Sequence, residues 1–307
     1  MEPKIIVITG STCSGKTFLS LKIARIINAE IISADSRQIY KYLSIGTAKP
    51  SVAELKEIPH HFIDILLPNQ PYNPIKFEKD ALATISEILQ RGNTPIVVGG
   101  SGLYVKSLVY GIADAGDNDE EYREKLYKER ELYGNEFIYE KLKDVDPVSA
   151  SKMLPQNWKR VIRALEVFHL TGKSINEFHL MHKRSSEYNF IQFGIEWDRE
   201  VLYEMINKRV DYMITNGLIG EVKNIIEMGY DKKMNALNTP GYKEIISYLE
   251  GDISVEQAVE LIKRNTRRYA KRQLTWFKAD KKINWNSIKS ELDFESVSQK
   301  IINELKN

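Results

Sequence analysis

The sequence contains very little cysteine and no long apolar run, and these absences exclude several protein classes. Cys13 is the only cysteine among 307 residues, so neither an intramolecular disulfide nor a cysteine-based zinc cluster can form. A single cysteine is typical of a reducing compartment, and we expect a cytoplasmic protein. No stretch of 18 apolar residues is present, so we expect no membrane span. We also expect no signal peptide, because residues 1–4 lead directly into an apolar strand pattern.

Histidine is scarce as well, with five residues in the chain. The spacing of His179 and His182 would place both on one face of a helix. No carboxylate or cysteine pattern surrounds this pair, and we therefore expect no metal site there.

The chain also lacks a large excess of either charge. It has 44 Lys and Arg residues against 42 Asp and Glu, a net charge of +2. This balance excludes a globally basic nucleic-acid coat but leaves room for a local basic surface. With 42% hydrophobic and 28% charged residues, the chain has the composition of a folded globular protein. Its length favours one large or two medium domains, and we expect a monomer.

The first 110 residues alternate short apolar runs with helical patterns. Apolar, β-branched runs at 4–10, 30–33, 61–65 and 95–98 predict strands. Between them, residues 16–28 have helical spacing, and a helix is expected from Asn73-Pro74, with Asn73 as N-cap, to about Gly92. The alternation predicts an α/β fold, a P-loop NTPase-like parallel sheet flanked by helices.

The pattern changes after this region. Residues 114–146 are strongly acidic, and charged, amphipathic helices are expected at 122–142 and 158–170. We interpret 115–189 as a helical insertion domain, with the catalytic core formed by 1–114 and 190–307. In the second part of the core we expect a strand at 190–197. Helices should follow at 199–215, 218–228, 241–250 and 255–278, the last with a capping box formed by Ser254 and Gln257.

The segment 10–17 matches the phosphate-binding pattern G-x-x-x-x-G-K-[ST], with a strand before it and a helix after it. Its backbone N–H groups and the following helix N-terminus can hold a di- or triphosphate. Lys16 would supply a charge to the terminal phosphate oxygens, and Thr17 a hydroxyl to Mg²⁺. The remaining alternative is a chance glycine turn before a helix. The residues of this loop are Gly10, Ser11, Thr12, Cys13, Ser14, Gly15, Lys16 and Thr17.

Two further segments follow strands, where parallel sheets place ligands. Asp35 follows the strand at 30–33 and can be a metal ligand, a general base or a helix cap. The segment 99–102, Gly-Gly-Ser-Gly, follows the strand at 95–98. It does not have the spacing of a dinucleotide-binding fingerprint, so we exclude that function.

Residues 263–282 carry a net charge of +8 on a predicted helix. Such a surface can neutralise nucleic-acid phosphates or can be a solvated helix face. We expect Trp276 and Phe277 in this segment to be core residues rather than base-stacking ones. Lys159, Arg160 and Arg163 form a second basic cluster near one helix face, which favours nucleic-acid binding.

Together these motifs resemble the bacterial tRNA dimethylallyltransferases, also called tRNA isopentenyltransferases. The resemblance runs nearly end to end. It includes GSTCSGKT at 10–17, SADSRQIY at 33–40, GTAKP at 46–50, IPHHFID at 58–64, VVGGSGLY at 97–104, KRVIRALEV at 159–167, GYKEI at 241–245 and TRRYAKRQLTWFK at 266–278. RVDYM and GLIGEV, between 209 and 222, also match. This family transfers a dimethylallyl group from dimethylallyl diphosphate to N6 of the adenine 3′ of the anticodon.

The resemblance implies a role for each matching segment. The loop 10–17 would hold the donor diphosphate with Lys16, Mg²⁺ through Thr17, and Arg209; such loops are also described as ATP-binding. Asp35 would be the general base, and Ser101 would lie near the reacting amine. Contacts with tRNA are implied for two segments and two single residues, namely Asp35, Ser36, Arg37, Gln38, Ser101, Arg123, Lys159, Arg160, Val161, Ile162 and Arg163.

The sequence departs from the family pattern in two places, at positions 101 and 159. Ser101 stands where Thr is usual, which keeps the hydroxyl, and Lys159 stands where Gln is commoner. The C-terminal zinc finger of eukaryotic relatives is missing, in keeping with the single cysteine. Without the resemblance, the residues support only a phosphate-loop enzyme that acts on or near nucleic acid. A small-molecule or nucleoside kinase and a non-catalytic RNA-binding NTPase remain the alternatives.

Overall fold

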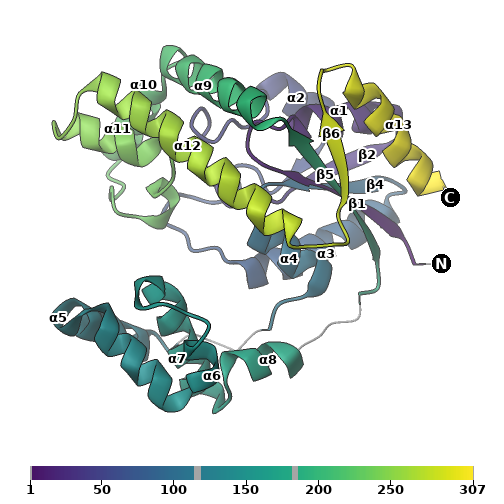
Figure 1. The fold of residues 1–307 in the computed structure, drawn as a ribbon. Coiled ribbons are helices and arrows are strands. Elements are labelled where there is room, and N and C mark those ends of the chain that lie inside the picture. Colours follow the sequence, from purple (N-terminus) through teal and green to yellow (C-terminus); the bar gives the residue numbers. More distant parts are fainter. Residues whose placement is uncertain (1, 114–118, 182–185, 307) are drawn as a thin grey trace. The chain divides into compact units, whose positions relative to one another are not determined.

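The computed structural model describes residues 2–113, 119–181 and 186–306, which form two compact units (Figure 1). The first joins Met1–Val109 to Ser186–Asn307, and the second is Tyr110–Ser185. The boundary expected after residue 114 lies outside the described residues, as does His182 of the histidine pair. Each unit has its own hydrophobic core.

The first unit is built on a six-stranded sheet with the order β3-β2-β4-β1-β5-β6, in which every neighbouring pair is parallel. The predicted parallel α/β fold is therefore confirmed. Strand β1 pairs residue by residue with β4 on one side and with β5 on the other. Ile8 of β1 thus lies opposite Val98 of β4 and Phe193 of β5. The strands are β1 (Lys4–Gly10), β2 (Ala29–Ser33), β3 (His60–His61), β4 (Thr94–Gly99), β5 (Asn189–Trp197) and β6 (Asn284–Ile288).

Alternate residues of β1 serve the two faces of this sheet. Ile5 and Val7 belong to one hydrophobic cluster, whereas Ile6 and Ile8 belong to the other, and all four side chains are buried. Because side chains alternate along a strand, an apolar run without polar interruption is the pattern for a strand covered on both faces. Each such side chain contributes about 1.5–3 kcal/mol of hydrophobic stabilisation.

Helices cover both faces of the sheet (Figure 1). On one face, α1 (Lys16–Ile26) and α13 (Asp293–Lys306) contribute to the cluster of Ile6 and Ile8. The cluster of Ile5 and Val7 receives apolar side chains from most other helices of the unit. These are α3 (Pro74–Gln90), α4 (Gly102–Tyr110), α9 (Arg199–Thr215), α10 (Leu218–Glu227), α11 (Tyr242–Leu249) and α12 (Val255–Lys278), while α2 (Val52–Glu57) is a short helix between β2 and β3.

Several local predictions are confirmed and others are corrected. Asn73 caps α3, and Ser254 and Gln257 form the capping box of α12. The strand expected at 61–65 is wrong beyond His61, because Phe62 and Asp64 adopt positive φ angles of 65° and 55°. The sequence analysis also missed β6 and α13.

The expectation that Trp276 is a core residue is wrong. Its side chain is 39% exposed and lies over Gly102, where a Cβ atom would come within 2.2 Å of the indole ring. Phe277, by contrast, is buried in the core as expected. The partly exposed indole of Trp276 thus packs on the first residue of α4.

The described part of the second unit is helical. Its main helix, α5 (Glu120–Val145), is interrupted at Gly134, which has φ 88°. The others are α6 (Pro147–Ala150), α7 (Trp158–Thr171) and α8 (Ile175–Met181), with a 3₁₀ turn at Pro155–Asn157. Leu126, Ile138 and Leu142 of α5 pack with Val161, Ile162 and Leu165 of α7 to form the core.

Candidate active site

The phosphate-binding loop connects β1 to α1, as the sequence predicts. Two of its positions require glycine for reasons visible in the structure. A Cβ atom at Gly10 would lie 2.7 Å from the carbonyl oxygen of Ile195, and one at Gly15 would lie 2.4 Å from the ring of Phe294. Gly15 also has φ 85°, which a side chain would disfavour. The loop is therefore packed tightly between β5 and α13.

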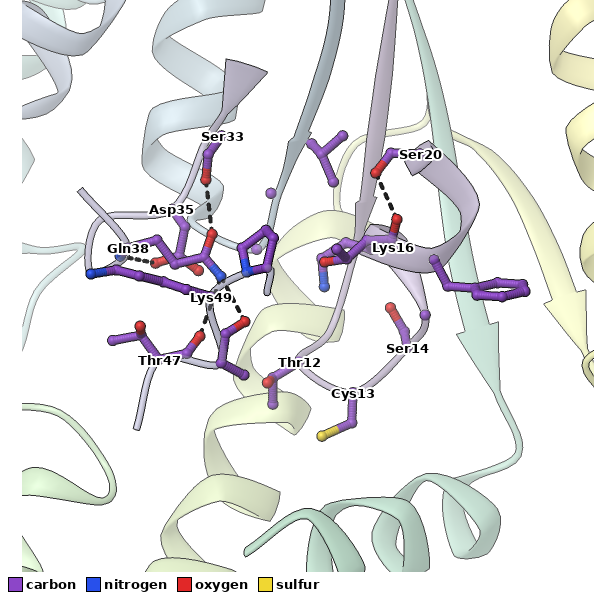
Figure 2. Close-up of a pocket in the computed structure, with 18 of the residues that line it drawn as sticks. Thr12, Cys13, Ser14, Lys16, Ser20, Ser33, Asp35, Gln38, Thr47 and Lys49 are labelled. Carbon is purple, nitrogen blue, oxygen red and sulfur yellow. Dashed lines mark hydrogen bonds between the residues drawn. The ribbon is translucent and has the colours of Figure 1, made fainter. Parts of the chain in front are cut away.

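A pocket of about 550 Å³ opens beside this loop. Figure 2 shows Thr12, Cys13 and Lys16 on one side of it, and Asp35, Gln38 and Thr47 on the other. Arg209 from α9 and Gln273 from α12 also line it. The structure thus brings together the predicted loop residues, Asp35 and Arg209, which come from distant parts of the sequence.

Lys16 carries the main positive charge of the loop. Its Nζ donates a hydrogen bond to the carbonyl oxygen of Ser11 at 2.5 Å. Burial lowers the pKa of Lys16 to about 8, because the ammonium loses hydration; Asp35 opposes this effect and Arg209 adds to it. A bound anion would replace the lost hydration, so this lysine is suited to binding a charged phosphate group.

Asp35 closes a turn at the end of β2. Its Oδ1 accepts hydrogen bonds from the backbone N–H groups of Arg37 at 2.8 Å and Gln38 at 3.3 Å. The turn orients the carboxylate toward the pocket that Lys16 also lines. Asp35 is followed by a turn rather than by a helix, so the helix-cap role left open by the sequence is wrong, and the carboxylate closes that turn instead. The carboxylate also lines the pocket, where it can accept a proton from a substrate.

Ser101 ties the turn after β2 to the end of β4. Its hydroxyl accepts a hydrogen bond from the N–H of Ser36 at 2.9 Å and lies 3.2 Å from the Ser36 hydroxyl. The neighbouring Gly99 permits this approach, since a Cβ atom there would lie 2.1 Å from the carbonyl oxygen of Ala34. The Gly-Gly-Ser-Gly segment thus packs closely against the end of β2, and its Gly99 and Gly100 line the pocket beside the phosphate loop.

Arg37 and Gln38 both make contacts within the protein. The Arg37 guanidinium donates to the carbonyl oxygen of Asn235 at 2.6 Å. The Gln38 amide donates to the carbonyl oxygens of Thr47 and Ala48, each at 3.2 Å, and accepts from Ser33 at 3.1 Å. These contacts give Gln38 a structural role in holding the pocket wall at 47–48.

Two groups of residues that line the pocket were not predicted from the sequence. Gln273 reaches the phosphate loop from within the basic helix, where nothing in the local pattern marks it out. Thr47, Ala48 and Lys49 also line the pocket. They belong to the segment GTAKP at 46–50, which matches the family but for which the resemblance implies no role. Lys49 forms an ion pair with Asp64, and burial lowers its pKa.

In the second unit, the predicted tRNA-contact segment divides into exposed and buried residues. Lys159 and Arg160 are exposed at the start of α7. The side chains of Val161 and Ile162 are buried in the core between α5 and α7, so the tRNA contacts predicted for these two positions could involve only their backbone. Arg123 forms a two-point ion pair with the buried carboxylate of Glu166, and Arg163 lies 3.6 Å from the same carboxylate.

The described residues offer neither a cluster of metal ligands nor a helix suited to a membrane. No group of three or more His, Cys, Asp or Glu side chains suited to a metal ion occurs in the described residues. The Thr17 hydroxyl does line the pocket beside the phosphate loop, and such a donor fits Mg²⁺ that is bound mainly through phosphate oxygens and water. Among the helices of residues 2–113, 119–181 and 186–306, none is long and apolar enough to cross a membrane.

Comparison with known proteins agrees with this architecture. A model of the family described as IPP transferase matches residues 38–280. A tRNA dimethylallyltransferase of Caldanaerobacter subterraneus is 46% identical over 305 residues, which cover 98% of this chain and 97% of that protein.

Solved structures give the same result. The tRNA isopentenylpyrophosphate transferase of Bacillus halodurans aligns with a TM-score of 0.72 at 38% identity, covering 100% of this chain and 97% of that one. A eukaryotic dimethylallyltransferase acting on tRNA aligns with a TM-score of 0.84 at 30% identity, covering 98% and 78%. The phosphate loop, the site around it and this end-to-end similarity lead to one conclusion: the chain belongs to the IPP transferase family, that of the tRNA dimethylallyltransferases.

Proposed function

We propose that this enzyme transfers a dimethylallyl group from dimethylallyl diphosphate to the exocyclic N6 of the adenine 3′ of the tRNA anticodon and releases diphosphate. The observation that carries this proposal is the placement of Asp35 on the same pocket as the phosphate loop. The pocket combines a place for a diphosphate leaving group with a carboxylate that can accept a proton. These are the two requirements of alkyl transfer to an amine.

The proposed reaction exchanges one covalent bond for another and moves one proton. The bond between the allylic carbon and the diphosphate oxygen breaks, N6 of adenine forms a bond to that carbon, and one N6 proton passes to Asp35. An adenine amine is a weak nucleophile because its lone pair is delocalised into the ring, so a hydrogen bond to Asp35 increases its reactivity as the bond forms. Ser101, through Ser36, holds the turn that carries Asp35.

Negative charge accumulates on the diphosphate as it leaves. Lys16, Arg209 and the N–H groups of the loop would stabilise this charge within the pocket. Magnesium, held by Thr17 and the phosphate oxygens, would add a further positive charge. The low pKa of Lys16 in the free protein fits this role, because the anion restores the environment that favours the ammonium.

The tRNA would be recognised mainly through its phosphates. The basic face of α12 and the exposed Lys159 and Arg160 of α7 offer positive charge for the anticodon stem-loop. The target adenine must leave its stack to reach Asp35, at a cost of a few kcal/mol that protein contacts offset. We also infer a cytoplasmic enzyme, because a single cysteine is typical of proteins of a reducing compartment, and we propose that it acts as a monomer.

The test uses purified protein, Mg²⁺ and an unmodified tRNA with adenine 3′ of its anticodon. Dimethylallyl diphosphate labelled in the allyl group and ATP labelled in the γ-phosphate are supplied in parallel reactions. We expect label to enter tRNA from the allyl donor alone. Transfer of phosphate from ATP without allyl transfer would identify a kinase and contradict the proposal.

A further inference from the structure

Gln273 connects the basic helix α12 to the phosphate loop. Its side-chain Oε1 accepts a hydrogen bond from the backbone N–H of Thr12 at 2.8 Å. Its Nε2 donates to the carbonyl oxygen of Gly100 at 2.8 Å. The residue is only 7% exposed, so water competes little for either contact. One amide therefore joins three elements: α12, the loop after β1 and the loop after β4.

The two contacts fix the orientation of the amide. Its oxygen must face the Thr12 N–H and its nitrogen the Gly100 carbonyl, since the reverse orientation would place like groups together. The fit at Gly100 is close, because a Cβ atom there would lie 2.5 Å from Nε2 of Gln273. An apolar residue at 273 would leave a buried donor and a buried acceptor unpaired, which is costly.

The contact also determines what the loop offers to an anion. The N–H of Thr12 donates to Gln273 and that of Ser14 donates to the carbonyl oxygen of Ser11 at 3.3 Å, so the donors left for a phosphate are Lys16 and the remaining N–H groups of the loop. Lys16 donates to Ser11, the residue next to Thr12, so displacement of Thr12 would move the lysine anchor as well. Gln273 is thus placed to set the shape of the loop without itself providing charge.

We propose that Gln273 is a positioning residue that holds the phosphate loop in the form that binds the donor diphosphate. This inference rests on the proposed function, since it assigns the loop to the diphosphate of the allyl donor. The resemblance assigned no role to this residue, and its contacts distinguish it from the arginines and lysines around it.

The test measures binding of inorganic diphosphate with Mg²⁺ by calorimetry, in the full chain. Gln273→Leu removes both hydrogen bonds and should weaken diphosphate binding about tenfold, while tRNA affinity stays unchanged. Gln273→Glu keeps the shape but replaces the donor to Gly100 with an oxygen. Gln299→Glu, at an exposed position of α13, introduces the same charge away from the site and serves as control.

The glutamate variant gives a readout that a general loss of stability would not produce. At pH 8 its carboxylate repels the Gly100 carbonyl, and we expect weak diphosphate binding. Burial at position 273 disfavours the carboxylate, so the carboxyl should regain a proton as the pH falls and can then again donate to Gly100. Its affinity relative to wild type should therefore recover toward low pH. The ratio to wild type at each pH removes the protonation of diphosphate itself, and the control ratio should stay near one.

The outcomes separate the two hypotheses. Wild-type binding of diphosphate with unchanged affinity in Gln273→Leu, or a pH-independent ratio for Gln273→Glu, would overturn the role of Gln273 and leave the proposed function intact. If wild type itself fails to bind diphosphate, the assignment of the loop to the donor is wrong, and the positioning role falls with it. If Gln273→Leu does not fold, the pH ratio of the glutamate variant decides.

Discussion

The guanidinium of Arg209 lies 3.4 Å from the sulfur of Cys13, so that α9 extends a positive charge to the phosphate loop. Arg209→Ala should therefore weaken donor binding. Hydrogen bonds to charged groups are worth about 1.5–3 kcal/mol, and we expect the KM for dimethylallyl diphosphate to rise about ten- to a hundredfold. Steady-state kinetics with each substrate varied in turn measure this. Arg199→Ala, at an exposed position of the same helix, should leave the donor KM unchanged.

The charge state of Lys16 predicts a pH dependence of donor binding. Burial lowers its pKa to about 8, so the free enzyme loses this positive charge as the pH rises through that value. Diphosphate affinity should fall between pH 7 and 9, and binding above pH 8 should take up a proton. Calorimetry in buffers of different ionisation enthalpy detects the uptake. In Lys16→Arg the side chain stays charged, and an equal fall in that variant would contradict the assignment.

Asp35 combines a structural and a chemical role, and two variants separate them. Asp35→Asn keeps an oxygen that accepts from the N–H groups of Arg37 and Gln38 but cannot accept a proton. We expect single-turnover transfer to fall about 10²- to 10⁴-fold with tRNA affinity unchanged. Asp35→Ala should show the same loss together with a less stable turn. Near-normal transfer in Asp35→Asn would exclude Asp35 as the base.

The ion pair between Arg123 and Glu166 stabilises the second unit. Glu166 has only 4% of its side chain exposed, so Arg123→Ala leaves a buried carboxylate without its main partner. Breaking such a pair costs about 3–5 kcal/mol, and we expect a clear fall in the thermal midpoint of the full chain. The double variant Arg123→Ala with Glu166→Gln should regain part of it. Equal midpoints for the single variant and wild type would show that the pair contributes little.

Arg163 belongs to the basic cluster of α7 that the resemblance associates with tRNA, and it lies 3.6 Å from the carboxylate of Glu166. If it neutralises a phosphate, Arg163→Ala should weaken tRNA binding and lower the slope of log affinity against log salt by about one. Filter binding over a range of KCl concentrations gives the slope. Lys152→Ala, an exposed change in the same unit, is the control. An unchanged slope for Arg163→Ala would exclude a phosphate contact.

The parts of this fold that the sequence predicts are those with local causes. β1 and β4 are apolar without interruption because both faces are covered, and the loop 10–17 has a fixed spacing. β6 was not predicted, because its sequence, NWNSI, is polar. It forms a strand by pairing with β5 rather than by its own pattern. Residues 62–65 are apolar enough to suggest a strand, but the positive φ of Phe62 ends it.

The site residues likewise divide into those that local sequence patterns predict and those that they do not. Lys16, Thr17 and Asp35 were found because their positions relative to strands and loops are fixed within a few residues. Gln273 was missed because its partners are 261 and 173 positions away, a relationship that no local pattern encodes. The burial of Val161 and Ile162 follows from the helical spacing of α7. The resemblance, by contrast, implies tRNA contacts for the whole segment and does not separate exposed from buried side chains.

The long separation between Thr12 and Gln273 has a consequence for synthesis on the ribosome. The phosphate loop emerges early, whereas the amide that holds it is translated 261 residues later. At about 5–20 residues per second, this delay is roughly 13–50 s. During most of that time β5 and α9, which also enclose the loop, are not yet complete, and α13 is translated only after Gln273. Nascent chains that end before α12 should therefore be unable to bind diphosphate, so that the enzyme acquires its donor site only near the end of translation.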